Sequence, residues 1–191
     1  PFVVDLSHPA SDLPEALTQK IRSQLEQLIH TLKLCDGLLH TQFIYKDDNF
    51  WLIEITRRCP GDLYSQLIQL SGAPGYALAY TAGFLGQAPT PAAQSAPDLI
   101  LRHTLSCPSK EFFYWANYEP TVPLRAIVPL MRPGERAEDQ PRRAAVAFYQ
   151  CPTPQSLDEL NGRLQANPWL YWQTPTGGKQ NTNELPSGPT A

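Results

Sequence analysis

Two strand-like segments on either side of three turn-forming residues constrain the fold of this chain more than any other feature. Residues 38–46 and 50–56 are rich in β-branched and aromatic side chains, and Asp47-Asp48-Asn49 separates them. Aspartate and asparagine tolerate the backbone conformations that tight turns between antiparallel strands require. The sequence therefore predicts a β-hairpin over residues 38–56.

The length of the hairpin loop decides which side chains face each other. With the three-residue loop 47–49, Lys46 pairs with Phe50, and Gln42 then lies opposite Glu54. Because side chains alternate between the faces of a strand, one face is polar and the reverse face is apolar. The polar set is His40, Gln42, Glu54 and Thr56, and the apolar pairs are Thr41 with Ile55, Phe43 with Ile53 and Tyr45 with Trp51. A two-residue loop would place Gln42 across from Ile55 and mix the faces, so we predict the longer loop.

The predicted pair Gln42 and Glu54 offers oxygen ligands at one point of the polar face. Directly opposed residues have Cβ atoms about 4.5–5.5 Å apart, which lets both side chains bind one small hard cation such as Mg²⁺. The alternative is that the polar side chains merely line a solvated face of the sheet, as in many antiparallel sheets. The hairpin alone does not distinguish a metal site from a wet surface.

The segment that follows the hairpin adds features of an anion site. Arg57 and Arg58 come directly after the second strand, and Asp62 is positioned to cap a helix over residues 63–70. Guanidinium groups and free N–H groups at a helix start match the oxygens of phosphate or carboxylate. The alternative for both arginines is a surface salt bridge, with Asp62 or Asp36 as the partner. An anion site beside a cation site suggests a nucleotide polyphosphate.

The rest of the chain predicts an α+β protein with two lobes. Further helices are expected over residues 15–34, 74–86 and 156–164, and strands over 2–6, 99–106, 111–118, 124–130 and 144–150. The helix 15–34 has a capping signal at its start, Ser11-Asp12-Leu13-Pro14-Glu15. We expect one block over residues 1–86, a linker or exposed loop over 87–97, a strand-rich lobe over 98–173 and a disordered tail over 174–191.

Composition excludes several classes of function. The formal net charge is −3 and the basic residues are scattered, so no nucleic-acid partner is expected. No apolar run approaches the roughly 20 residues that span a bilayer, and no signal peptide is recognisable, so we expect a cytoplasmic protein without a membrane partner. The cysteines lie far apart, which indicates reduced thiols rather than a zinc site. The start at Pro1 suggests that the chain continues further upstream.

The hairpin and the segment after it resemble the ATP-grasp superfamily of ligases. In that family the closing hairpin of the core typically ends in Glu-(apolar)-Asn-Pro-Arg, and an acidic residue or Gln stands on the preceding strand. The matching residues here are Glu54-Ile55-Thr56-Arg57-Arg58, with Gln42 before them. The order of the elements over residues 1–86 is similar to the carboxylase-like and carbamoyl-phosphate-synthetase-like branch. The resemblance implies the C-terminal half of an ATP-grasp domain, with a small strand-rich lobe after it.

The resemblance also implies roles for individual residues. Glu54 would bridge Mg²⁺ ions bound to the phosphates of ATP, and Gln42 would be a second metal ligand. Arg58, with Arg57 beside it, would stabilise charge on the phosphoryl group, and Arg58 would contact the phosphate or the acyl-phosphate intermediate. Thr56 stands at the third metal position, where Asn is usual. His40, two residues before Gln42, could contact phosphate or substrate, although a hydrogen-bonded structural role is the commoner one for such a residue.

The reaction that the family implies is the activation of a carboxylate by ATP, followed by attack of an amine or thiol. The cofactors would be ATP and Mg²⁺, or Mn²⁺ in its place, and the partners the small-molecule substrates, the N-terminal half of the same chain and a second copy in a homodimer. Without that half we expect the chain to be inactive. Because Gln42 and Thr56 leave Glu54 as the one anionic ligand, a degenerate, non-catalytic lobe that binds a partner or dimerises is the alternative.

Overall fold

The chain folds into two units that are best described separately. The computed structural model describes residues 5–10, 13–47, 49–72, 75–88, 98–116, 121–166 and 172–173. One unit spans Pro9–Asp98, and the other combines Pro1–His8 with Leu99–Ala191. Of the first residues, the described residues 5–8 therefore group with the C-terminal part, whereas we expected them in one block with residues up to 86. The predicted linker beyond residue 88 and the predicted tail from residue 174 lie outside the described residues.

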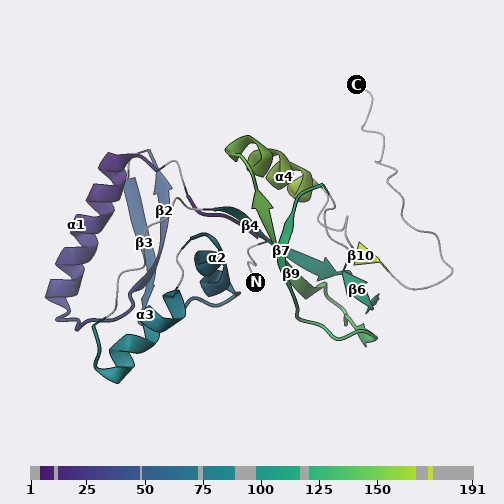
Figure 1. Cartoon of the computed structure of the whole chain (residues 1–191), viewed down its shortest axis with the longest axis horizontal. Helices are drawn as coiled ribbons and strands as arrows, with labels where there is room; N and C mark the ends of the chain where they lie inside the picture. Colours follow the sequence, from purple (N-terminus) through teal and green to yellow (C-terminus); the bar gives the residue numbers. More distant parts are fainter. Residues whose placement is uncertain are drawn as a thin grey trace. The chain divides into compact units, whose positions relative to one another are not determined.

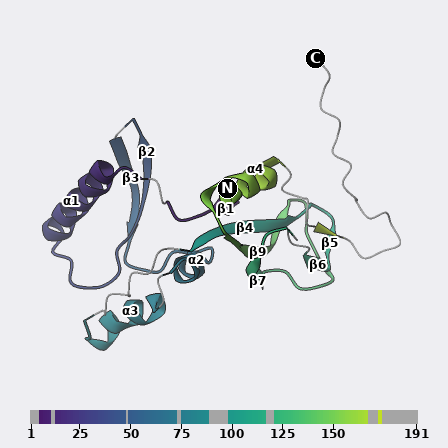
Figure 2. The same cartoon turned by 45° about the horizontal axis from the view of Figure 1, so that its top comes forward.

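In its described residues, the unit Pro9–Asp98 contains a long helix, a hairpin, two short helices and a 3₁₀ turn. Its elements are α1 (Glu15–Thr31), β2 (His40–Lys46), β3 (Asn49–Thr56), α2 (Tyr64–Leu70), α3 (Tyr76–Ala82) and the 3₁₀ turn η1 (Gly83–Leu85). Helix α1 lies alongside the hairpin in both views (Figures 1 and 2). It buries Leu17, and Lys20 hydrogen-bonds the side chain of Asn49 at the turn end of the hairpin. Helix α1 begins at Glu15 after an N-cap at Pro14, where no side chain caps it, and it ends three residues before the predicted position.

The hairpin confirms the pairing of Gln42 with Glu54 but corrects the predicted loop. Lys46 pairs with Asn49, so two residues connect the strands instead of three. The register shifts between Gln42 and Phe43, which leaves Ile53 as an extra, bulged residue in β3. The predicted pairs of Phe43 with Ile53 and Tyr45 with Trp51 are therefore wrong, and the observed pairs are Phe43 with Leu52, Ile44 with Trp51 and Tyr45 with Phe50.

The physical reason for this correction lies in the turn and the bulge together. Two-residue turns with left-handed residues match the twist of antiparallel strands, and Asp47 has a φ of 50°. Such a turn shifts the pairing near the loop by one residue, and the bulge at Ile53 restores the predicted pairing towards the open end. As a consequence Ile44 and Trp51 lie on the same face as Gln42 and are more than half exposed.

Helix α2 begins one residue later than predicted and is not capped by Asp62. Its N-cap is Leu63, and no side chain hydrogen-bonds the free N–H groups there. Asp62 and Leu63 have φ values of 54° and 60°, which places both in the left-handed region. Asparagine or aspartate caps a helix from an extended conformation, so a left-handed Asp62 is not in a position to do so. The predicted helix at residues 74–86 is found as α3 and η1, and Gly86 ends it in the left-handed conformation.

The second unit is built on a four-stranded antiparallel sheet of order β1-β4-β9-β7. These strands are β1 (Leu6–Ser7), β4 (Leu99–Cys107), β9 (Arg142–Cys151) and β7 (Leu124–Pro129). Strands β4, β7 and β9 confirm the predictions for residues 99–106, 124–130 and 144–150. The predicted strand 111–118 is interrupted: β5 (Phe112–Phe113) pairs with β8 (Glu135–Arg136), and β6 (Trp115–Ala116) pairs with β10 (Trp172–Gln173). Of the predicted strand at residues 2–6, only Leu6 lies in a described strand, β1; Asp5 is outside it, and residues 2–4 lie outside the described part of the chain.

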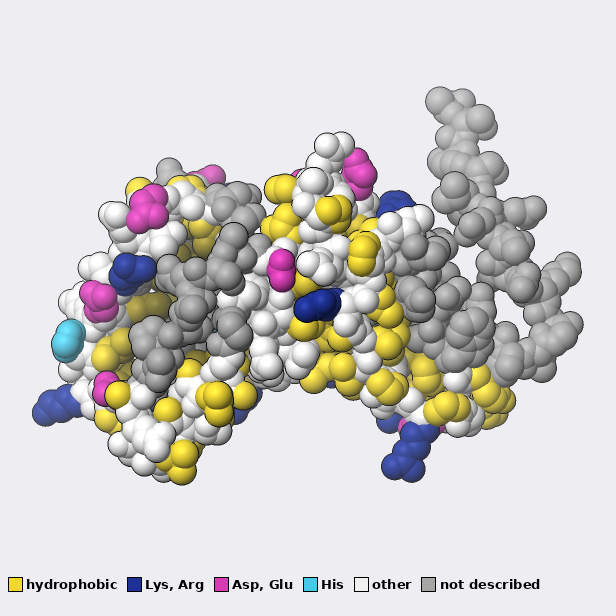
Figure 3. All heavy atoms as spheres, viewed as in Figure 1, with side chains coloured by type: hydrophobic (Ala, Val, Ile, Leu, Met, Phe, Trp, Pro, Cys, Tyr) yellow, Lys and Arg dark blue, Asp and Glu magenta, His cyan; other side chains and the backbone are white. Residues whose placement is uncertain are grey.

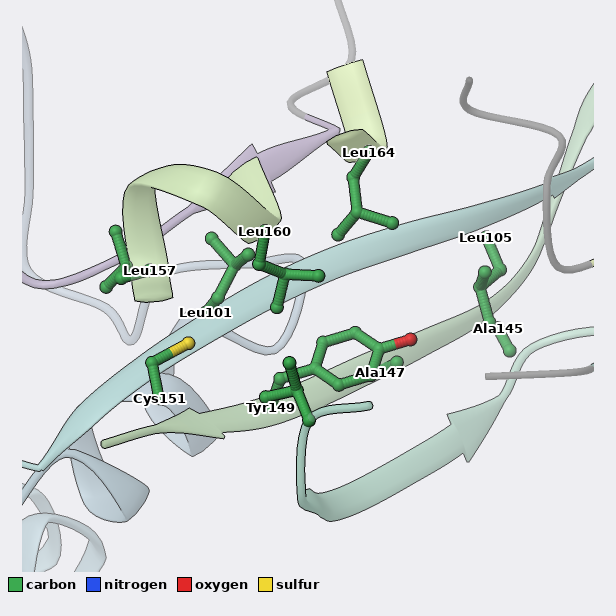
Figure 4. Close-up of a cluster of buried hydrophobic side chains, with 10 residues drawn as sticks. Leu101, Leu105, Ala145, Ala147, Tyr149, Cys151, Leu157, Leu160 and Leu164 are labelled. Atoms are coloured by element: carbon green, nitrogen blue, oxygen red, sulfur yellow. The ribbon is translucent and has the colours of Figure 1, made fainter. Parts of the chain in front are cut away.

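One of the two hydrophobic clusters described in this unit lies between the sheet and α4 (Pro154–Ala166), the predicted helix 156–164. Leu157, Leu160 and Leu164 recur at helical spacing and point from α4 onto the sheet (Figure 4). Leu101 of β4 and Tyr149 of β9 lie beneath them and are fully buried. Strands β4 and β9 are buried along most of their length, which is typical of central strands that are covered on both faces.

Three consecutive polar residues are buried in the middle of β4. Arg102, His103 and Thr104 are each at most 2% exposed, and the Arg102 guanidinium donates a hydrogen bond to the Thr104 hydroxyl at 3.2 Å. His103 lies in the strand between Leu6 of β1 and Ala147 of β9. Neither of its ring nitrogens has a hydrogen-bond partner within the residues that the structure describes. Burial, with a smaller contribution from the positive charge of Arg102, lowers the pKa of His103 to about 4.

We expect His103 to make this protein acid-labile. The pKa of a histidine in the unfolded chain is about 6.5, so between pH 6.5 and 4 the unfolded state binds more protons than the folded state. The free energy of unfolding should therefore fall as the pH falls through this window, by about 2 kcal/mol between pH 6.5 and 5. Urea unfolding of wild type, His103→Leu and His30→Gln at pH 6.5 and at pH 5 measures this loss of unfolding free energy. His103→Leu should lose most of the pH dependence and His30→Gln, an exposed control, should keep it; equal slopes in all three would contradict the assignment.

None of the helices in the described part of the chain is long and apolar enough to span a bilayer.

Candidate functional site

The predicted polar side chains lie together at the open end of the hairpin. His40 pairs with Thr56, and Gln42 pairs with Glu54, so the members of each pair share one face of the sheet. Gln42 and Glu54 are exposed, whereas His40 and Thr56 are half-buried. The Nδ1 atom of His40 is buried and has no hydrogen-bond partner among the described residues. A buried nitrogen without a partner is unfavourable by about 1–3 kcal/mol, which a hydrogen bond to a ligand would offset.

Arg58 extends from the end of β3, directly after this group. Its backbone N–H donates to the Thr56 hydroxyl at 3.4 Å, and its Nη1 donates to the carbonyl oxygen of Cys59 at 3.1 Å. In the described part of the chain its guanidinium forms no ion pair, so the alternative of a surface salt bridge with Asp62 or Asp36 is not found for this residue. The side chain is exposed and keeps further N–H donors for an anion.

Arg57 is directed to a different place from Arg58. Its Nη2 donates two hydrogen bonds, to the carbonyl oxygens of Cys35 at 2.9 Å and of Asp36 at 3.1 Å. Both acceptors belong to the loop that precedes β2. The contact with Asp36 is therefore through the backbone, and no ion pair with its carboxylate is found in the described part of the chain. The guanidinium of Arg57 links the end of β3 to this loop.

The turn after Arg58 is held to helix α3 through Cys59. Burial raises the pKa of the Tyr76 hydroxyl to about 12, and a hydrogen bond with the Cys59 side chain adds to this shift. Cys59 is half-buried, and Tyr76 is the first residue of α3. The segment that carries Arg58 is thus flanked by residues anchored on both sides, Arg57 before it and Cys59 after it.

The sequence analysis missed the residues that support the two arginines. Gly37 follows Asp36 in an Asp-Gly dipeptide, which is a turn signal that could have indicated a tight loop before β2. The carbonyl groups of Cys35 and Asp36 carry no sequence signal, because every residue has one. Tyr76 belongs to no recognisable sequence motif, and only the fold places it next to Cys59.

The oxygen donors on this face fit a hard divalent cation, although there are few of them. The amide oxygen of Gln42, the carboxylate of Glu54 and the hydroxyl of Thr56 are oxygen donors of the kind that Mg²⁺ binds. No group of three or more His, Cys, Asp or Glu side chains capable of holding a metal occurs in residues 5–166 where these are described. Glu54 is the one carboxylate among the predicted ligands Gln42, Glu54 and Thr56, and phosphate oxygens of a ligand would have to complete the coordination.

The described structure is similar to several solved ligase structures. It matches the L-amino acid ligase from Bacillus licheniformis with a TM-score of 0.69 at 13% identity, over 86% of this chain and 43% of that chain. It matches the phosphoribosylglycinamide synthetase from Anaerococcus prevotii with a TM-score of 0.58 at 13% identity, over 85% of this chain and 43% of that one. The chain shares the ATP-grasp fold of these ligases. The predicted fold class is thereby confirmed.

A third neighbour supports the same conclusion about the fold. The N5-carboxyaminoimidazole ribonucleotide synthetase from Thermus thermophilus matches with a TM-score of 0.56 at 18% identity, over 90% of this chain and 44% of that one. The chain thus spans less than half the length of these three solved structures. No model of a protein family matches the sequence, and no curated protein matches it. The specific branch of the superfamily stays a prediction.

Proposed function

We propose that this chain is the C-terminal part of an ATP-dependent ligase that activates a carboxylate as an acyl phosphate and transfers it to an amine or thiol. One observation carries the proposal: Glu54 and Gln42 form a direct cross-strand pair on the face where His40 has a buried nitrogen without a described partner. Arg58 follows two residues after Thr56 on the same strand end, and its guanidinium is exposed. The fold supports the proposal, because three neighbours in structure are ligases or synthetases by name.

In this proposal each residue has a separate task. Glu54 and Gln42 hold a divalent cation on the exposed face of the hairpin, with the hydroxyl of Thr56 beside them. A bound Mg²⁺ would neutralise charge on the phosphate oxygens of ATP. Arg58 donates hydrogen bonds to the phosphoryl group during transfer and to the acyl phosphate, where negative charge is spread over several oxygens. His40 supplies one further hydrogen bond through Nδ1, which satisfies that buried atom.

Calorimetric titration with ATP in the presence of Mg²⁺ tests the metal assignment in the full-length protein. Glu54→Ala removes the one carboxylate of the site, and we expect it to weaken Mg·ATP binding by about tenfold or more, since hydrogen bonds and contacts to charged groups contribute about 1.5–3 kcal/mol. Glu26→Ala, an exposed carboxylate on α1, is the matched control and should bind like wild type. Equal affinity of the Glu54 and Glu26 variants would remove the basis for the metal site.

A second function is favoured by the apolar surface of this unit. Hydrophobic side chains gather on the surface over α3 and η1 (Figure 3), and Leu78 of α3 and Phe84 of η1 are both 75% exposed. Exposed apolar groups of this kind are common where proteins bind partners. A non-catalytic lobe that binds a partner or a second copy would show this surface and would need only one carboxylate on the hairpin. It predicts no Mg²⁺-dependent affinity for ATP, so the same titration separates the two functions.

A further inference from the structure

The guanidinium of Arg57 is hydrogen-bonded to the backbone carbonyl groups of Cys35 and Asp36, and we call this pair of bonds the Arg57 clasp. The proposed reaction does not by itself explain it. The same nitrogen, Nη2, donates to the carbonyl oxygens of Cys35 and Asp36, at 2.9 and 3.1 Å. Hydrogen bonds from a charged donor are stronger than those between neutral groups. They connect the end of β3 with the loop before β2, two segments that are 21 and 22 residues apart in the sequence.

Gly37 leaves the space that this clasp needs. A Cβ atom at this position would lie 2.6 Å from Nη2 of Arg57, which is closer than a real side chain allows. The φ of Gly37 is 139°, a conformation that residues with a side chain rarely adopt. Gly83 of η1 also packs here, because a Cβ on it would lie 3.8 Å from the Cα of Gly37. The loop is therefore fixed by contacts from two elements.

Arg58 itself has little that holds it in place. Within the described residues its side chain hydrogen-bonds only to Cys59, its neighbour in the chain, and its backbone N–H makes a long bond to Thr56. The orientation of Arg58 therefore depends on the backbone at residues 57–59. Two neighbours fix this backbone: Cys59 through its hydrogen bond with Tyr76 of α3, and Arg57 through its bonds to the loop before β2.

We infer that Arg57 is a positioning residue: by binding the carbonyl groups of Cys35 and Asp36, with Gly37 leaving room, it holds Arg58 where it contacts the phosphates. This inference rests on the proposed function, and it changes the role that the sequence suggested for Arg57. Arg57 does not bind the nucleotide directly, and it acts through the neighbouring guanidinium. Misplacement of a catalytic group by about 1 Å costs on the order of 100-fold in rate, so a clasp of this kind has a measurable effect.

A double-mutant cycle in the full-length protein tests the clasp, with Mg·ATP as the probe and its Kd as the readout. Arg57→Gln removes the clasp, and Gly37→Ala inserts a methyl group where Nη2 lies. We expect each single substitution to weaken Mg·ATP binding by about tenfold, since hydrogen bonds from a charged donor have an effect of this size. The double variant should bind no more weakly than the weaker of the two single variants, because both substitutions remove the same hydrogen bonds. Gly61→Ala is the control, because no atom lies within 4 Å of a Cβ there, and it should bind like wild type.

Each alternative role for Arg57 predicts a different set of Kd values and melting temperatures for these variants. If Arg57 contacts phosphate itself, Gly37→Ala leaves the Kd close to that of Gly61→Ala, or the two effects multiply in the double variant; either result overturns the inference. If the clasp only stabilises the fold, Arg57→Gln lowers the melting temperature with Kd unchanged, which also overturns it. If Arg58→Gln leaves both the Kd and the turnover unchanged, the proposed role of Arg58 itself fails, so the two failures are distinguishable.

If Gly37→Ala does not fold, a second measurement tests the inference without this variant. Hydrogen exchange of the Arg58 and Cys59 amides reports on the segment directly, without any nucleotide. We expect Arg57→Gln to speed exchange there and Arg57→Lys, which can donate to the same carbonyl oxygens, to restore part of the protection. Exchange that is equal in wild type and Arg57→Gln would contradict the clasp.

Discussion

Replacing Arg58 by glutamine should lower the turnover of the full-length protein by a factor on the order of 100 to 1000. The proposed role of Arg58 is to donate to oxygens on which charge develops during phosphoryl transfer, and the loss of one such donor has an effect of this size. The fold should hardly change, because the guanidinium is exposed and bonds only to the adjacent Cys59 among the described residues. Substitutions at such surface positions usually change stability by less than about 0.5 kcal/mol.

ADP formation from Mg·ATP with a mixed panel of carboxylates and amines measures this turnover, and thermal unfolding of the same samples measures stability. Arg22→Gln, an exposed arginine on α1, is the control and should behave like wild type in both assays. A variant with unchanged turnover and a clearly lower melting temperature would reassign Arg58 to the structure of the turn.

Truncation of Leu160 should cost about 2–5 kcal/mol of folding free energy. Leu160 is fully buried on α4, between Leu157 and Leu164, and it points onto β4 and β9 (Figure 4). Its replacement by alanine removes the packing and leaves a cavity that a sheet covered on both faces cannot close. Denaturant unfolding gives the value directly.

The control for this prediction is Leu78→Ala on α3, where the same change is made at a side chain that is 75% exposed. Alanine has the highest helix propensity, so this variant should be as stable as wild type within about 0.5 kcal/mol. A loss of less than about 1 kcal/mol in Leu160→Ala would mean that α4 does not form the core of its unit.

The pairing at the open end of the hairpin could be predicted from the sequence, because it follows from the alternation of polar and apolar side chains. Gln42 opposite Glu54 is found as predicted. The loop and the bulge could not be predicted, since a short turn with a compensating bulge gives the same pairing at that end as a longer loop. Ile53 carries no signal that distinguishes a bulged residue from a paired one.

The contacts that hold Arg57 and Arg58 in place could not be predicted from local sequence patterns. Arg57 and Arg58 are adjacent, alike in the sequence and both exposed, yet Arg57 binds backbone carbonyl groups of a distant loop and Arg58 binds only that of its neighbour Cys59 among the described residues. The acceptors are main-chain atoms, so only the fold shows which arginine reaches them. The capping role predicted for Asp62 failed for a similar reason, because its left-handed conformation is set by the turn and not by its residue type.

The most direct test of the central claim is the position of a paramagnetic ion bound with ATP. With Mn²⁺ in place of Mg²⁺, the side-chain amide signals of Gln42 should broaden selectively in NMR spectra of the full-length protein, and Glu54→Ala should abolish that broadening. Gln27, on the exposed surface of α1, provides a reference signal. Sharp Gln42 signals at saturating Mn·ATP would contradict the claim that this cross-strand pair holds the metal of the nucleotide.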